Sequence, residues 1–453
     1  MPAAQTTQTD SSVDSNVGSQ LDPQRERAVY ITADLPGIGG VIKQRPEDFL
    51  VDETAAYQPS GEGDHLYLYV EKRNLTTPEA ARIIAAHFGV APDSVGYAGM
   101  KDRVAITRQL FSVHTPGKTP EDFPQLVHDH LQVQWADRHT NKIRLGHLTG
   151  NRFSIRIREV GVGRIRAAKA CLDRLVQFGV PNRFGPQRFG RALNNHLVGR
   201  AILCANFNDA IRLILAPEHA TTEAHAKAGA FFLEGRYDEA LTELPHSSYT
   251  ERLLMRAMAK GQRPSRAIKT LERSTLRFFL SAFQSVAFNM VLDERLKAGT
   301  LHELHAGDVA FKHDSRACFD VDEAVASDPT TPDRLRKFEI SASGPMWGAE
   351  MRRASGPTDA TELAVLDRLN VSLPQLQAFD KSAGQLIEGA RRPLRVPLSF
   401  PEFEAGLDEH GEYIRVAFDL PRGAFATVAL EEIMKVGNRA TPASTDSPDE
   451  DNE

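Results

Sequence analysis

The sequence predicts an α+β protein in which a second, mostly helical domain is inserted into a mixed α/β domain. Three observations predict this fold. Residues 38–160 alternate short β-like runs with a helical stretch, residues 192–296 are rich in Ala, Leu and Arg and predict helices, and a β-like run returns near residue 413. A switch of pattern and a return to the first one is typical of an inserted domain.

The first elements are three strands and a helix. Residues 41–53 predict a strand, a turn and a second strand, and residues 65–71 predict another strand. Thr76 and Glu79 have the spacing of a capping box, so we expect a helix to begin there, and Gly89 to end it.

The next elements are a basic strand, a helix and an irregular loop. Residues 152–158 alternate strictly, with three apolar residues on one face and arginines on the other, which predicts a half-buried strand. Residues 163–177 predict a helix. Residues 182–190 are too dense in Gly, Pro, Arg and Phe to form a regular element.

The rest of the chain is helical and then returns to a strand. Residues 274–296 are its most hydrophobic stretch, with apolar residues at helical spacing, which indicates a buried core helix. Residues 413–419 alternate and predict a strand, and residues 424–435 predict a short helix. No internal repeat is visible.

The net charge of −6 is concentrated in the two tails. Residues 1–28 carry a net charge of −2 and residues 441–453 a net charge of −5, so −6 + 2 + 5 leaves +1 for residues 29–440. Both tails are poor in apolar residues and rich in Ser, Thr, Pro and acid. We therefore expect 1–28 and 441–453 to be disordered.

Residues 141–200 form a strongly basic segment. They carry thirteen Lys and Arg residues and only two acids. Solvated helix faces would be an alternative, but this imbalance favours an anionic partner, and nucleic acid rather than membrane because the cations alternate with strands and turns. We expect affinity for such a partner to fall steeply with salt.

Several classes of protein are disfavoured. No stretch approaches the roughly 20 apolar residues of a membrane span, and the first residues do not resemble a secretory signal. Three widely separated cysteines favour reduced thiols in a cytoplasm, and no His or Cys spacing suggests a metal site. We therefore expect a cytoplasmic protein without a membrane partner or a metal.

Asp102 is the principal candidate for chemistry. It lies between Lys101 and Arg103, after a run of small residues and before a β-like run, so its carboxylate would point from the end of a buried element. Neighbouring cations would keep it ionised, which suits a nucleophile or a base. A surface Asp in a turn is the alternative interpretation.

Five motifs together give the chain a resemblance to the TruD family of tRNA pseudouridine synthases. They are Arg45-Pro46-Glu47-Asp48-Phe49, Gly99-Met100-Lys101-Asp102-Arg103, Gly150-Asn151-Arg152-Phe153, Asn182-Arg183-Phe184-Gly185-Pro186-Gln187-Arg188-Phe189-Gly190 and Leu420-Pro421-Arg422-Gly423-Ala424-Phe425-Ala426-Thr427. The resemblance spans residues 38–435. It implies isomerisation of uridine to pseudouridine in tRNA, typically at position 13, without a cofactor or metal.

The resemblance also implies roles for individual residues. Asp102 matches the catalytic aspartate, and Phe153 matches the aromatic residue that packs on the target base. Asn151 would position the base or the aspartate, although the strand and turn patterns alone would make Phe153 a core residue and Asn151 a turn residue. Lys43 would pair with the catalytic carboxylate. Independently of the resemblance, Lys101 and Arg103 are sequence neighbours of Asp102 and should diverge from it in an extended segment, so we expect them to contact phosphate instead.

Further residues would bind the substrate. Glu47 and Phe49 belong to a motif that lines the cleft in the family, and Arg183 and Arg188 are candidates for contact with RNA. Asp102 would attack C1′ of the sugar or remove the proton from C2′. Closure around the detached uracil would keep water from the intermediate.

The family fold suggests boundaries for the domains. Residues 29–190 and 345–440 would form a catalytic domain with a mainly antiparallel mixed sheet, and residues 191–344 would form the inserted domain, with the RNA cleft between the two. We expect tRNA as the partner, no small-molecule cofactor, and a monomer.

Two other functions remain open from the sequence. A base-excising hydrolase would also use a carboxylate at an anomeric carbon, but it usually needs a second one, for which Glu47 is the obvious candidate. An RNA-binding module or chaperone that has lost catalysis is the non-enzymatic alternative.

Overall fold

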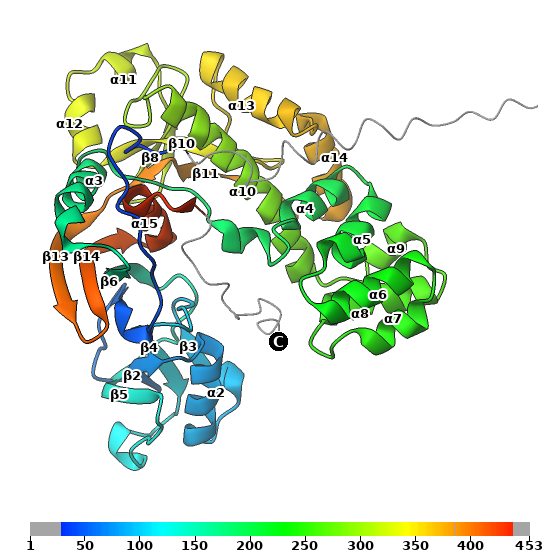
Figure 1. The fold of residues 1–453 in the computed structure, drawn as a ribbon, viewed down its shortest axis with the longest axis horizontal. Helices are drawn as coiled ribbons and strands as arrows, with labels where there is room; N and C mark the ends of the chain where they lie inside the picture. The colour runs from blue at the N-terminus through cyan, green and yellow to red at the C-terminus, as the bar shows by residue number, and fades with distance from the viewer. Residues whose placement is uncertain (1–28, 385, 438–453) are drawn as a thin grey trace, which may run out of the picture. The chain divides into compact units, whose positions relative to one another are not determined.

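The structure is a computed structural model and describes residues 29–384 and 386–437. The tails predicted to be disordered, 1–28 and 441–453, lie outside the described residues. Within the described residues the chain forms two compact units (Figure 1). We call residues 30–183 with 395–437 the sheet unit, and residues 184–394 the helical unit.

The sheet unit is built on an eight-stranded sheet. Its order is β13-β14-β6-β1-β4-β2-β5, with β3 paired to β4. The strands are β1 Phe49–Ala55, β2 His65–Arg73, β3 Val95–Tyr97, β4 Ile106–His114, β5 Leu131–His139, β6 Leu148–Arg158, β13 Ser399–Asp408 and β14 Gly411–Pro421. Only β1 and β4 run parallel among these pairs. The predicted mixed, mainly antiparallel sheet is therefore confirmed.

Three helices cover this sheet, and short elements join them. The helices are α2 Thr77–Phe88, α3 Ile165–Phe178 and α15 Ala426–Met434; β7 Val180–Pro181 pairs with β12 Arg395–Val396, and single 3-10 turns lie at Pro46–Asp48, Pro92–Ser94, Pro120–Asp122 and Val162–Arg164. Thr76 and Glu79 make the predicted capping box of α2, and Gly89 ends that helix in the left-handed conformation. Both predictions are confirmed.

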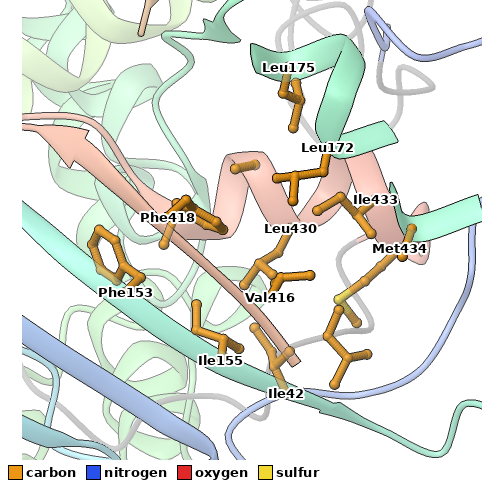
Figure 2. Close-up of a cluster of buried hydrophobic side chains, with 14 of the residues drawn as sticks. Ile42, Phe153, Ile155, Leu172, Leu175, Val416, Phe418, Leu430, Ile433 and Met434 are labelled. Carbon is orange, nitrogen blue, oxygen red and sulfur yellow. The ribbon is translucent and has the colours of Figure 1, made fainter. Parts of the chain in front are cut away.

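The main core lies between the sheet and helices α3 and α15. Figure 2 shows apolar side chains of β6 and β14, among them Phe153 and Phe418, facing those of the two helices. The helical residues labelled there are Leu172, Leu175, Leu430, Ile433 and Met434. Their burial explains the strict alternation of residues 152–158, because a strand with one covered face must alternate.

The helical unit contains eleven helices and four short strands among its described residues. They are α4 Asn195–Leu203, α5 Phe207–Leu215, α6 Glu223–Leu233, α7 Tyr237–Glu243, α8 Tyr249–Ala259, α9 Pro264–Ile268, α10 Arg273–Lys297, α11 Glu323–Ser327, α12 Thr331–Arg336, α13 Gly356–Arg368 and α14 Leu373–Ala383, with 3-10 turns at Pro186–Phe189 and Pro217–His219. The strands β8 Val309–Lys312, β9 Cys318–Asp320, β10 Ile340–Met346 and β11 Ala390–Pro393 form a sheet of order β11-β10-β8-β9.

Helix α10 is the central helix of this unit. By length and composition it would be able to cross a membrane, but 61% of its most apolar window is buried inside the protein. It packs against α4 and strand β10. It is thus the buried core helix that the apolar spacing of residues 274–296 predicted.

The joins between the units differ from those expected from the sequence. The chain passes between units at 183/184 and again at 394/395. The expected join near Gly344 lies instead within β10, which pairs with both β8 and β11. Because β10 pairs on both sides with strands of the helical unit, Gly344 belongs to that unit. Composition changes near Gly344, but the strand pairing continues past it.

Candidate active site

Asp102 lies in a loop between β3 and β4 that is held from its buried side. The ammonium group of Lys72, which is 1% exposed, donates to the carbonyl oxygens of Leu75 at 2.5 Å, Asp102 at 3.1 Å and Lys101 at 3.4 Å. A buried charge with several carbonyl acceptors is an effective tether. Lys72 therefore holds the backbone of the Asp102 loop, although the sequence analysis did not single it out.

Two neutral side chains hold the same loop from α2 and β4. Thr77 Oγ1 accepts from the backbone N–H of Lys101 at 2.9 Å and donates to Gln109 Oε1 at 3.0 Å, while Gln109 Nε2 donates to the carbonyl of Gly99 at 3.0 Å. Thr77 and Gln109 are fully buried. The start of the helix and the strand thus fix the path of the chain on the N-terminal side of Asp102.

Lys101 is not available to RNA in this structure. Its Nζ lies 2.6 Å from Glu53 Oε2, and the two side chains are 5% and 1% exposed. The expectation that Lys101 contacts phosphate is therefore wrong, because the ammonium points into the protein and neutralises a buried carboxylate. Arg103 is 42% exposed and lies 3.8 Å from Glu79, so it remains accessible.

Lys43 faces Asp102, although the two are far apart in the sequence. Lys43 Nζ lies 3.0 Å from Asp102 Oδ2, and the side chains are 7% and 35% exposed. Among the described residues, no hydrogen bond or ion pair engages the second oxygen, Oδ1. The carboxylate is thus anchored through one oxygen and open to a substrate through the other.

The same ammonium group connects Asp102 to two aromatic rings. Lys43 Nζ lies 4.6 Å from the centroid of the Phe49 ring, and Phe49 meets Phe153 edge-on at 6.4 Å. Phe153 also lies 5.9 Å from Phe418. It is 7% exposed, so it forms the edge of the core rather than an open platform.

Lys43 adopts an uncommon backbone conformation. Its φ is +59°, in the left-handed region, where a residue with a side chain is uncommon and strained. The residues before it hold it there: Val41 forms a two-way backbone bridge with Arg158 at the end of β6, and Ile42 is buried in the core. This anchoring directs the side chain toward Asp102.

The site occupies a polar strip on one face of the sheet. Cross-strand partners in a sheet share a face, and residues two apart in a strand do so as well. The strand registers therefore place five polar side chains on the face that carries Val51 and Phe153. This polar strip consists of Glu53, Lys72, Thr107, Gln109 and Asn151.

The polar strip separates two apolar clusters. On one side α3 and α15 cover β6 and β14, and on the other side α2 covers β2 and β4. Between them Asn151 Oδ1 is buried and has no hydrogen-bond partner among the described residues. A buried amide oxygen without a donor is costly, and this makes it a candidate acceptor for a substrate group.

Glu47, Arg183 and Arg188 are the remaining predicted site residues. Glu47 pairs with Arg73 and lies 3.9 Å from Arg45 Nε. Burial is the largest single influence on the pKa of Glu47 and raises it, but a backbone N–H and the two arginines together outweigh burial and lower the pKa. Arg183 is close enough to Tyr30 to act on its pKa. Arg188 belongs to the helical unit.

Much of the basic segment is neutralised within the sheet unit. On β6, Arg152 pairs with Glu402 and Asp419, Arg156 with Asp408, and Arg158 with Asp48 and Asp408. On α3, Lys169 pairs with Asp173 and Arg174 with Asp34. The carboxylates come mostly from outside residues 141–200, so the local excess of positive charge overstated the charge that is available to RNA.

Comparison with known proteins identifies a single family. Residues 26–433 match the family model described as tRNA pseudouridine synthase D (TruD). The chain is 42% identical to proteins named tRNA pseudouridine synthase D from Geobacter sp. (strain M21) and Geobacter sulfurreducens, each alignment covering 90% of this chain and 99% or 96% of the relative. A crystal structure described as that of the putative tRNA pseudouridine synthase D (TruD) from Methanosarcina mazei matches with a TM-score of 0.77 and 29% identity, over 92% of this chain and 98% of the other.

Proposed function

The chain belongs to the TruD family of tRNA pseudouridine synthases and isomerises uridine to pseudouridine in tRNA; we propose that Asp102 carries out this reaction and that the target is position 13. The choice of position rests on the usual target of the family. The choice of residue rests on one observation: Lys43 holds one oxygen of a partly exposed carboxylate at 3.0 Å and leaves the other oxygen open.

The reaction breaks the N1–C1′ bond of uridine and forms a bond from C5 of the uracil to the same C1′. The proton on C5 is lost and N1 gains one, so no oxidant, reductant or water is consumed. Asp102 serves either as a nucleophile at C1′ or as the base that removes the C2′ proton. In both routes the carboxylate of Asp102 acts first, and Lys43 Nζ faces that carboxylate at 3.0 Å.

The remaining candidates bind and hold the uracil. Phe49 and Phe153 supply apolar surface beside Lys43, and Asn151 offers an unpartnered amide oxygen to the N3–H of uracil or to a ribose hydroxyl. Glu47 lies in the 3-10 turn just before β1, and Arg183 and Arg188 contact the RNA backbone. The sheet unit is then the catalytic domain, and the protein works as a cytoplasmic monomer without a cofactor.

Mapping of pseudouridine in a tRNA transcript tests this assignment. Wild type is expected to modify position 13, and Asp102→Asn to modify nothing while keeping its affinity for tRNA. Asp52→Asn is a matched control, since Asp52 is 41% exposed, pairs with Arg108 and lies in the same unit. Unchanged modification by Asp102→Asn would overturn the role of Asp102, and release of free uracil would identify a hydrolase instead.

A further inference from the structure

Leu145 lies at the tip of a tight turn in the sheet unit. The backbone N–H of His147 donates to the carbonyl of Arg144 at 3.0 Å, and Gly146 has a φ of +90°. A positive φ at the third residue of such a turn is characteristic of type II, which leaves the second residue at the corner. That residue is Leu145, and its side chain is 69% exposed.

The turn is bonded to the Asp102 loop. The backbone N–H of Gly146 donates to the carbonyl of Ala98 in that loop at 2.8 Å, and the carbonyl of Gly146 accepts from Arg422 Nη1 at 2.5 Å. Ala98 precedes Asp102 by four residues, so the Cα atoms of the two are at most about 14 Å apart. The turn that carries Leu145 is therefore held near the proposed catalytic residue before any substrate arrives.

Cations flank this leucine. Arg144 precedes it in the turn, is exposed, and makes no ion pair with a carboxylate of the described residues. Arg422 is also exposed and is bonded to Gly146, the residue that follows Leu145. A single exposed leucine is ordinary on a protein surface. A leucine between two arginines, however, suits a ligand with a charged backbone and stacked apolar faces, and tRNA is such a ligand.

The reaction requires the target uridine to leave its stack. A nucleotide that is stacked inside folded RNA does not present its C1′ or C2′ to a protein carboxylate, so it must be extruded before Asp102 can act. Extrusion costs free energy because the neighbouring bases lose a stacking partner. Proteins that separate stacked bases insert apolar side chains such as Leu, Met or Phe between them.

We propose that Leu145 inserts into the gap that the target uridine leaves in the base stack. It holds the neighbouring bases apart while the uridine lies at Asp102, and Arg144 and Arg422 contact the phosphates on either side of the gap. The proposal rests on the proposed function, because it takes Asp102 as the group that the extruded nucleotide must reach.

Met100 is the other candidate for this role. It lies in the Asp102 loop itself and is 49% exposed. A methionine side chain has more rotatable bonds than leucine and loses more conformational entropy when it is buried. Leu145 is also the more exposed of the two, and the hydrogen bonds of Gly146 fix its turn. These differences favour Leu145.

Fluorescence of 2-aminopurine tests the insertion directly. The probe replaces the nucleotide on the 3′ side of the target in a tRNA transcript, and Asp102→Asn is used to bind it without turnover. Fluorescence should rise on binding, because the probe loses a stacking partner. Most of this rise should be lost in Asp102→Asn/Leu145→Ala. The control is Asp102→Asn/Leu407→Ala, which should keep it, since Leu407 is 75% exposed and lies at the hairpin end of β13.

Single-turnover rates test the same step in the active enzyme. Leu145→Ala should lower the rate on tRNA on the order of tenfold. Leu145→Met should restore most of it, and Leu407→Ala should equal wild type. The thermal midpoint of Leu145→Ala should stay that of wild type, because an exposed side chain adds little to stability. An abasic nucleotide beside the target should shrink the deficit of Leu145→Ala, because less stacking has to be broken.

Three outcomes would overturn the proposal. The first is a fluorescence rise and a rate that are unchanged by Leu145→Ala. The second is loss of both in Met100→Ala alone, which would give the role to Met100. The third is an equal deficit of Leu145→Ala on ordinary and abasic tRNA, which would mean that Leu145 only supports the site. The proposed function fails separately: if Asp102→Asn still forms pseudouridine, Asp102 is not the catalyst, and the fluorescence of the Leu145 variants still reports insertion.

Discussion

The ammonium group of Lys72 donates to the backbone carbonyl of Asp102 at 3.1 Å, while the carboxylate of Asp102 faces Lys43. Asp102 is therefore held by two lysines with different tasks. Lys43 contacts the carboxylate and Lys72 fixes the backbone that carries it. We expect catalysis to depend on both, because a reacting group displaced by about 1 Å loses on the order of 10²-fold in rate.

Replacement of Lys72 should lower kcat more than it changes KM. Lys72→Met leaves carbonyl groups without their donor, which costs roughly 1–3 kcal/mol and releases the loop. We expect kcat to fall on the order of ten- to a hundredfold in steady-state assays on tRNA. Lys142→Met is the matched control, since Lys142 also donates to a loop carbonyl, that of Asp93, but does not contact the Asp102 loop. Equal kcat values for the two variants would contradict the positioning role.

Replacement of Lys43 should impair chemistry without unfolding the protein. Lys43→Met removes the charge that faces Asp102, and loss of one such electrostatic contact typically costs on the order of 10²-fold in kcat. Its partner is 35% exposed, so the free energy of unfolding should change by only about 1 kcal/mol. Single-turnover rates and urea unfolding measure the two effects. Lys43→Arg should recover part of the rate. A Lys43→Met protein as active as wild type would exclude the pair of Lys43 and Asp102 from the mechanism.

The buried pair of Lys101 and Glu53 should contribute to stability and to its pH dependence. Burial raises the pKa of Glu53, and Lys101 opposes this shift. In Lys101→Met the opposing charge is gone, so the folded protein retains a proton on Glu53 at pH values where the unfolded chain has lost it. The free energy of unfolding should then fall as pH rises from about 4.3, the ordinary value of Glu, toward 8.

Urea unfolding of wild type, Lys101→Met and Lys101→Met/Glu53→Leu tests this pair. Removal of one partner from a buried ion pair costs roughly 3–5 kcal/mol. Lys101→Met should therefore be strongly destabilised at pH 8 and less so at pH 5, and Lys101→Met/Glu53→Leu should recover much of the loss. A Lys101→Met protein whose stability does not depend on pH over this range would show that Glu53 does not carry the effect.

Affinity for tRNA should depend on the arginines that remain unpaired. Arg164 is exposed on the turn before α3 without an ion pair to the described residues, whereas Arg156 pairs with Asp408 and lies over the ring of Tyr413. If Arg164 meets phosphate, Arg164→Gln lowers the salt slope by roughly 0.7–0.9. Arg156→Gln should leave the slope unchanged. Filter binding at several salt concentrations measures both slopes, and a slope that falls in Arg156→Gln but not in Arg164→Gln would contradict this assignment.

Local patterns predicted most of the elements but not those that depend on pairing. The capping box at Thr76 and the alternation of residues 152–158 need only neighbours in sequence, and both were predicted correctly. Strand β13 was missed because Pro401 interrupts its run and no clear alternation marks it. It forms as an edge strand through its hairpin with β14.

The candidate site could be predicted only in part, for a similar physical reason. The family motifs identified Asp102, Lys43 and Phe49, which the structure brings together. Lys72 and Glu53 carried a weaker signal: each continues the apolar face of its strand at period two, after Val70 and Val51. A charge on an apolar face implies a buried partner, but which partner depends on strand register, and no local pattern specifies register.

Strand β14 lies between β13 and β6 in the sheet, although it comes near the end of the chain. During synthesis, β6 has emerged long before its neighbour and must wait with an unpaired edge while the whole helical unit is translated. The sheet that carries Asp102 is complete only after residue 421 has left the ribosome. The helical unit, whose described residues are consecutive in sequence apart from residue 385, can fold earlier. Truncation within β14 should therefore leave β6 as an aggregation-prone edge.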